Sequence, residues 1–159
     1  MGLTRTERII LANQYQILAL LDKQNARDYD TIREALEDNY PLAYEGLFDR
    51  FRDGLTMEEC GFVNEVLAMY DALQRTKVAD AHFPGFDGNN ETMFMTYARH
   101  IRKREGRFDY LDVGSPDLNS HFPSVEGYRR MLDVWKRHDK SYELKADQAK
   151  EILAARRLR

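Results

Sequence analysis

The chain has 159 residues, of which 43% are hydrophobic and 32% are charged, and its formal net charge at pH 7 is −3. This length suits one ordinary domain, and the composition excludes a disordered chain. The longest apolar run, residues 17–21, is far shorter than the roughly 20 residues that span a bilayer, so no membrane partner is expected.

The beginning of the chain and the cysteine usage suggest a cytoplasmic protein. Cys60 is the only cysteine, so no disulfide can form within the chain, which suits a reducing compartment. The first residues lack the uninterrupted apolar stretch and small-residue cleavage site of a secretory leader. We therefore expect a cytoplasmic location.

The first helix is predicted over residues 4–21. Thr4 and Glu7 form a capping-box pattern, in which a hydroxyl and a carboxylate satisfy open N–H groups of the first turn. Ile10, Ile17 and Leu21 then follow helical spacing. Further aliphatic side chains widen this apolar face, which is typical of a helix in the centre of a core or at a subunit contact.

Three more helices are predicted before residue 78. One runs from about Asn25, a suitable N-cap residue, to residue 37, and the next from Pro41 to Gly54. A second capping box, Thr56 with Glu59, starts a helix that ends near residue 77. Apolar residues cover so much of its circumference that we expect other elements to pack around nearly all of it.

The second half predicts three helices around one long irregular connection. They cover residues 91–105, a segment that begins after residue 124, and a segment around residues 149–153. Residues 107–123, with Gly-Ser-Pro at their centre, are irregular and long for a loop. The fold class is therefore all-α, a multihelical array of about seven helices. We expect a single domain over residues 1–159, with residues 78–90 as the one place for a subdivision.

Four blocks of sequence resemble a known family. They are RIILANQY at residues 8–15, GFD at 85–87, EGR at 105–107 and YRRMLDVW at 128–135. In order and spacing they resemble the YfbU-like family of bacterial helical proteins, over about residues 4–153. The resemblance implies an all-helical fold, a bacterial cytoplasmic setting and self-association, and it implies no reaction. The chain departs from the family pattern at Lys145, where a better helix cap would be expected.

A basic cluster is the first candidate site. Residues 1–95 carry 9 basic and 17 acidic side chains, whereas residues 96–159 carry 15 and 10. Arg99, Arg102 and Lys103 share one side of a predicted helix, and Arg129 and Arg130 could extend the face toward the phosphates of a nucleic acid. The plainer interpretation is that cations complement the end of a helix dipole, and the net acidity of the chain favours it.

A second candidate site lies in the connection at residues 107–123. Asp112 and His121 could form a general acid–base pair of a small hydrolase. Ordinary turn chemistry also explains such residues and is the favoured interpretation, because no spacing rule of a catalytic motif is met. The histidines lack the paired spacing of helical metal ligands, so we expect no metal and no cofactor.

The sequence therefore favours a non-enzymatic, self-associating binding or regulatory module, with a dimer as the expected assembly. The helix over residues 4–21, or the one that begins at residue 56, would supply the contact, since each has more apolar surface than one neighbour can cover. The alternatives are a nucleic-acid-associated regulator that uses the basic face and a small hydrolase.

Overall fold

The structure, a computed structural model, describes residues 2–49, 51 and 53–157. Seven α-helices and one short 3-10 helix lie within these residues, and their only β pairing consists of two isolated bridges. The predicted all-α, multihelical fold class is therefore confirmed. Within the same described residues, none of the helices has the length and apolar character needed to cross a membrane.

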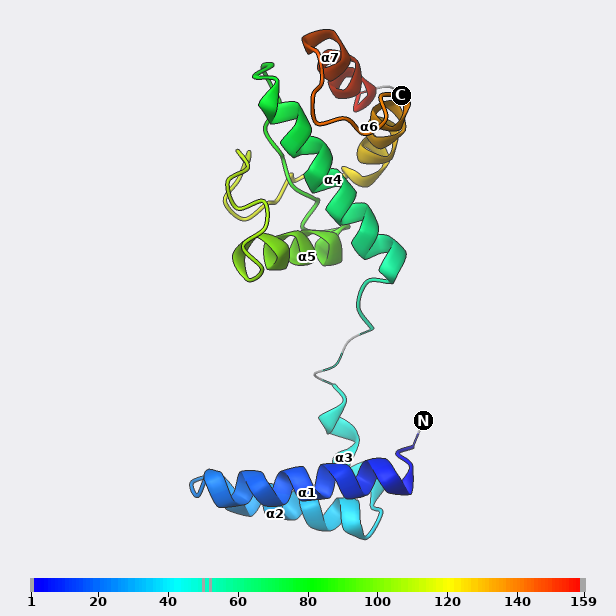
Figure 1. Ribbon diagram of the computed structural model, residues 1–159. Coiled ribbons are helices and arrows are strands. Elements are labelled where there is room, and N and C mark those ends of the chain that lie inside the picture. The colour runs from blue at the N-terminus through cyan, green and yellow to red at the C-terminus, as the bar shows by residue number, and fades with distance from the viewer. Residues whose placement is uncertain (1, 50, 52, 158–159) are drawn as a thin grey trace. The chain divides into compact units, whose positions relative to one another are not determined.

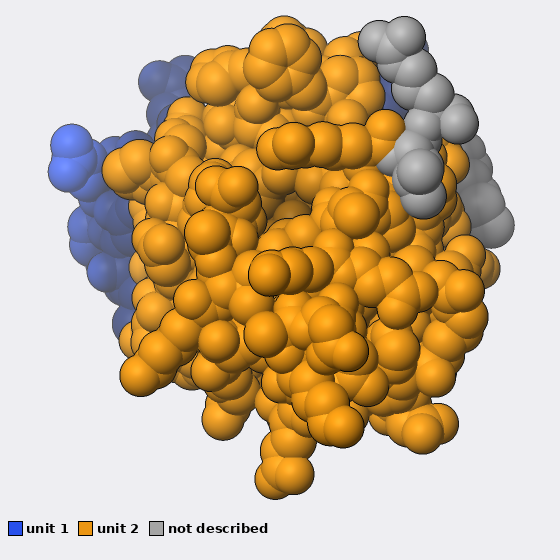
Figure 2. Space-filling view, turned by 90° about the horizontal axis from the view of Figure 1, so that it is seen from above, with its two compact units in different colours: residues 1–53 blue, residues 54–159 orange. Residues whose placement is uncertain are grey.

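The chain forms two compact units, residues 1–53 and residues 54–159, coloured blue and orange in Figure 2. Residues 78–90, where the sequence suggests a subdivision, lie inside the second unit. The single domain over residues 1–159 stays a prediction.

The first unit is a helical hairpin. Helices α1 (Arg5–Leu21) and α2 (Ala26–Glu37) lie side by side and run antiparallel (Figure 1). The predicted capping box starts α1, since the Glu7 carboxylate accepts from Thr4 N at 2.7 Å and Thr4 Oγ1 accepts from Glu7 N at 3.2 Å. The predicted cap at Asn25 is wrong in detail, because its side chain donates to Asp22 at 2.9 Å instead of capping α2.

The helix predicted over residues 41–54 is much shorter in the structure. It begins at Pro41, as predicted, but α3 covers only Pro41–Tyr44 and continues as a 3-10 turn over Glu45–Leu47. Gly46 lies in that turn, and glycine in a helix interior costs about 1 kcal/mol relative to alanine. Two positions of the predicted helix, 50 and 52, lie outside the described residues.

The second unit is built around α4 (Met57–Arg75), which contacts α5 (Thr92–Lys103) and α6 (Val125–Arg137), while α7 (Ala146–Ala155) packs on α6. The predicted capping box of Thr56 and Glu59 is confirmed, with Thr56 N donating to the Glu59 carboxylate at 2.8 Å. Eight residues of α4 are buried. The wide apolar face of this helix is therefore buried in the core of its own unit.

Two irregular segments, residues 81–91 and 107–124, are joined by backbone hydrogen bonds. Phe83 N donates to Asp112 O and Phe86 N to Leu118 O, both at 2.9 Å. Beneath them, four buried rings lie with neighbouring centroids 5.1–6.0 Å apart: those of Tyr70, Phe83, Phe86 and Tyr128. The long connection predicted at residues 107–123 is thus irregular, as expected, and is held in place by a packed aromatic core.

Candidate functional site

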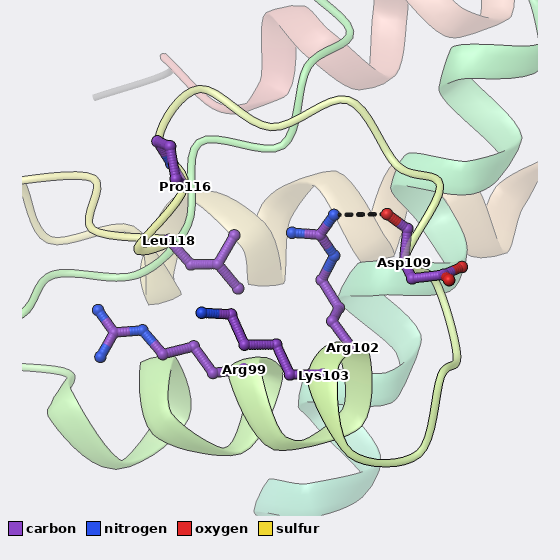
Figure 3. Close-up of a pocket in the computed structure, with 6 residues that line it drawn as sticks. All are labelled: Arg99, Arg102, Lys103, Asp109, Pro116 and Leu118. Carbon is purple, nitrogen blue, oxygen red and sulfur yellow. Dashed lines mark hydrogen bonds between the residues drawn. The ribbon is translucent and has the colours of Figure 1, made fainter.

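Three of the five predicted basic residues lie together in one hollow. It holds about 140 Å³ between α5 and the connection at residues 107–123. In Figure 3 the side chains from α5 project toward that connection. The hollow is lined by Arg99, Arg102, Lys103, Asp109, Pro116 and Leu118.

Arg102 holds the connection through its backbone. Its guanidinium donates to the carbonyl oxygens of Phe108 at 2.8 Å, Asp109 at 2.9 Å and Leu111 at 3.1 Å. Partial burial lowers the pKa of this guanidinium from its ordinary value, but an arginine remains charged at neutral pH. Three of its five N–H donors are therefore occupied within the chain.

The two neighbours of Arg102 differ in how they are used. Arg99 donates to Asp117 O at 2.5 Å and lies 3.8 Å from the Asp117 carboxylate. The Lys103 amine makes no hydrogen bond or ion pair with any described residue. Of the three cations in this hollow, Lys103 is the one whose charge is left for a ligand.

Arg129 and Arg130 are also engaged, on α6. Arg130 donates to Ala155 O at 3.1 Å and Arg156 O at 3.0 Å, so it caps the end of α7. Arg129 lies 3.7 Å from the Glu126 carboxylate and over the Phe62 ring, 5.0 Å from its centroid. Four of the five predicted basic residues thus contact groups of their own chain, and nucleic-acid binding by this face stays a prediction.

We expect Arg102→Lys to destabilise the second unit by about 2 kcal/mol, because a lysine lacks the planar fork that reaches three carbonyl groups. Urea unfolding followed by Trp135 fluorescence measures the loss, since this single tryptophan is buried in the same unit. Lys103→Arg is the matched control and should change stability by less than about 0.5 kcal/mol. Equal midpoints for both variants and the parent would rule out the clamping role.

The two residues of the predicted loop site have different surroundings. Asp112 pairs with Gln74 through its backbone, at 2.8 and 2.9 Å, and lines a hollow together with His82. His121 has a positive φ of 58° and donates its backbone N–H to the Asn119 side chain at 2.9 Å. No hydrogen bond joins the described side chains of Asp112 and His121, so the hydrolase stays a prediction without a formed pair.

Glu91 is a buried residue that the sequence interpretation did not single out. Its carboxylate accepts backbone N–H groups of Ser124 at 2.8 Å, Val125 at 2.9 Å and Asp87 at 2.9 Å. It therefore caps α6 from a distance, in place of Ser124, whose own hydroxyl caps nothing there. No fixed spacing in the sequence signals this role, because the helix that Glu91 caps begins 34 residues later, at Val125.

Asp87 is held in the same turn and is only 2% exposed. Its carboxylate accepts from Asn89 N at 3.0 Å and from the Asn90 side chain at 2.5 Å. These hydrogen bonds to the charged form lower the pKa of Asp87 below its ordinary value. Asp87 and Glu91 thus stabilise the loop structure, and neither carboxylate faces an open cavity described in the structure.

The largest group of exposed apolar side chains among the described residues lies on α1. The helix buries only Ala12 and Ala19, while six large aliphatic side chains on it are 40–78% exposed. They are Ile9, Ile10, Ile17, Leu18, Leu20 and Leu21, which we call the α1 face. Ile10, Ile17 and Leu21 follow a spacing of seven and four, so they lie on one side of the helix, opposite the buried alanines.

Among the described residues, no group of three or more histidine, cysteine or carboxylate side chains is close enough to hold a metal ion. Cys60 is a free, half-buried thiol near the start of α4. Its sulfur lies 4.0 Å from Leu55 O, so it packs at the edge of the core.

Comparisons with known proteins agree on one family. The family model described as the YfbU domain matches residues 1–155. A relative from Methanocaldococcus jannaschii, named a UPF0304 protein, is 34% identical over 169 aligned positions, covering 96% of this chain and 99% of the relative. That organism is an archaeon, so this relative does not confirm the bacterial setting that the resemblance implies. The family is uncharacterised.

Proposed function

The chain belongs to the YfbU domain family, and we propose that it is a non-enzymatic, self-associating helical module whose partner is a second copy of itself. The observation that carries the proposal is the α1 face, a set of large aliphatic side chains left exposed on a helix that buries alanines. A cytoplasmic location is part of the proposal, since the single cysteine needs no oxidising compartment.

The first unit leaves a large share of its apolar side chains exposed to solvent. Ten of the fifteen exposed large hydrophobic side chains among the described residues lie in the first unit, although it holds only about a third of the chain. A unit of about 50 residues is marginal in stability even when its apolar residues are well buried. Its buried core cluster consists of Ala12, Ala35, Leu36 and Tyr44. Covering the α1 face would supply the missing burial.

A second copy is the occupant that fits best. The five exposed large hydrophobic residues of the second unit are methionines and aromatic residues, whereas those of the α1 face are all isoleucines and leucines. The stripe of Ile10, Gln14, Ile17 and Leu21 has the four-three-four spacing of a coiled-coil seam. Two such stripes match each other across a two-fold axis, which is the commonest arrangement of homodimers.

We expect Ile17→Asp to weaken dimerisation at least 100-fold, because a desolvated, unpaired carboxylate in an apolar contact costs about 3 kcal/mol or more. Ile17 is 55% exposed, so the free chain tolerates the charge. Light scattering coupled to size exclusion, over a range of protein concentrations, measures the molar mass of both forms.

The matched control is Met57→Asp. Met57 is 89% exposed at the start of α4, so this variant removes an exposed apolar side chain and adds the same charge outside the first unit. The control should keep the mass of the parent chain. A parent chain that is monomeric at high concentration, or an Ile17→Asp variant that dimerises like the parent, would overturn the proposal.

A further inference from the structure

A second hollow in unit 2 has a different chemistry from the one that holds Arg102. It has a volume of about 740 Å³ and lies between the end of α4, with the turn that follows it, and α7. Figure 2 shows one face of unit 2, and the surface of that face is hollowed near its centre. This volume is in the range of small-molecule sites, about 300–1,000 Å³.

Four cations line this hollow without partners. The side chains of Lys77, Lys150, Arg156 and Arg157 make no hydrogen bond or ion pair with any described residue, and the only carboxylate among the lining residues is that of Asp80. The arginines of α5 and α6, by contrast, donate to carbonyl and carboxylate oxygens of the chain. Unpaired like charges around a concave surface repel one another and attract an anion.

The helix dipoles account for only part of this charge. The lining reaches the C-terminal ends of α4 and α7, and also Ala146 at the start of α7. A helix carries about half a negative charge at its C-terminal end and about half a positive charge at its start. Together with Asp80, the two C-terminal ends therefore balance at most about two of the four cations. A positive excess therefore remains for a ligand.

Contacts within the chain hold part of the site in place before any ligand binds. The Arg156 guanidinium lies over the buried Tyr128 ring, 5.9 Å from its centroid, and Arg156 O accepts from Arg130 at 3.0 Å. These contacts hold the end of α7 against α6, which fixes the position of the neighbouring cation. Half-buried Val78 and Leu153 add an apolar part to the same lining.

We propose that this hollow, the cationic groove, binds a small anion that carries two or more phosphate groups. Lysine and arginine are the usual phosphate ligands in proteins, and four of them around one cavity suit several negative charges. A recessed cavity favours a small molecule over an extended polyanion, which would also meet the net negative charge of the whole chain.

The test is calorimetric titration of the full-length chain with inorganic triphosphate at low ionic strength. We expect saturable one-site binding, and Lys150→Glu should weaken it at least 10-fold. Lys150 is exposed and unpartnered on α7, so the variant folds like the parent. The control is Lys103→Glu, the same charge reversal in the hollow at α5, and it should change the affinity less than twofold.

Three outcomes would overturn this assignment. The first is the absence of saturable heat when triphosphate is titrated into the parent chain. The second is an equal loss of affinity in Lys150→Glu and Lys103→Glu, which would mean a general charge effect. A single-stranded oligonucleotide at equal phosphate concentration that binds more tightly than triphosphate, with equal losses in both variants, would assign the charge to an extended nucleic-acid surface. None of these results depends on the oligomeric state.

Discussion

Replacing Gly85 by alanine should destabilise the second unit by more than about 4 kcal/mol. Gly85 has a φ of +93°, and a Cβ atom there would lie 2.0 Å from Leu118 O and 2.3 Å from Leu118 C. Both are backbone atoms of the paired connection, so no side-chain rotation relieves the overlap. The clash would break the hydrogen bond from Phe86 N to Leu118 O, at 2.9 Å, and displace Gly85 O from the Tyr128 hydroxyl.

Equilibrium unfolding in urea, followed by Trp135 fluorescence, measures this loss. Gly61→Ala is the matched control, because Gly61 lies on the exposed side of α4 and an added Cβ meets nothing within 4 Å. That control should stabilise the chain by about 0.5–1 kcal/mol, as expected when alanine replaces glycine in a helix. If Gly85→Ala fails to fold while Gly61→Ala folds well, the expectation is met. A Gly85→Ala chain within about 1 kcal/mol of the parent would contradict it.

The second large effect is expected for Glu91→Gln, at about 3 kcal/mol. The carboxylate accepts three backbone N–H groups, and hydrogen bonds to a charged group contribute about 1.5–3 kcal/mol each. Glutamine keeps the shape but has one acceptor oxygen, so its amino group must face at least one N–H donor. The start of α6 and the turn at Asp87 should both loosen.

Hydrogen exchange separates this effect from a general loss of stability. The amide of Asp87 should lose protection first in the Glu91→Gln chain. One oxygen of the Glu91 carboxylate accepts both Ser124 N and Val125 N, and the glutamine oxygen can take its place, which leaves the glutamine NH2 group facing Asp87 N. Glu143→Gln is the control, since Glu143 is exposed and its carboxylate has no partner among the described residues. If both variants unfold at the urea concentration of the parent, Glu91 does not hold these elements together.

The helices of this fold were largely predictable, for a local physical reason. Both capping boxes, at Thr4 and at Thr56, use residues three positions apart, so sequence alone specifies where α1 and α4 begin. The first helix ends at residue 21, as predicted. At Lys145, where a poor cap was expected, the backbone N–H instead donates to Gln148 at 2.8 Å, which is the other half of a capping box.

The parts that could not be predicted depend on contacts between distant residues. Glu91 caps a helix that begins 34 residues later, and Gly85 is required by the backbone of Leu118. Neither relation leaves a pattern of fixed spacing in the sequence. The basic residues show the same limit, because Arg102 has the composition of a binding face but donates to a segment whose position only the fold determines.

The structure narrows the proposed dimer contact from two helices to one. From the sequence, both the helix over residues 4–21 and the helix that begins at residue 56 have more apolar surface than one neighbouring helix can bury. In the structure α4 uses its breadth within the core of the second unit, with Val63, Val66 and Leu67 fully buried. Helix α1 leaves most of its large aliphatic side chains exposed, and it is therefore the helix that we propose for self-association.

Disulfide trapping tests that proposal most directly. The parent is the full-length chain with Cys60→Ser, into which single cysteines are placed at Ile10, Gln14, Ile17 and Leu21, and at Met57 as the control. In a two-fold contact along this stripe, at least one position meets its own copy at a Cα separation of about 4.4–6.8 Å, within reach of a disulfide. We predict a covalent dimer from one or two neighbouring stripe positions and none from the control. Equal cross-linking at stripe and control positions, or none at any stripe position, would contradict self-association through α1.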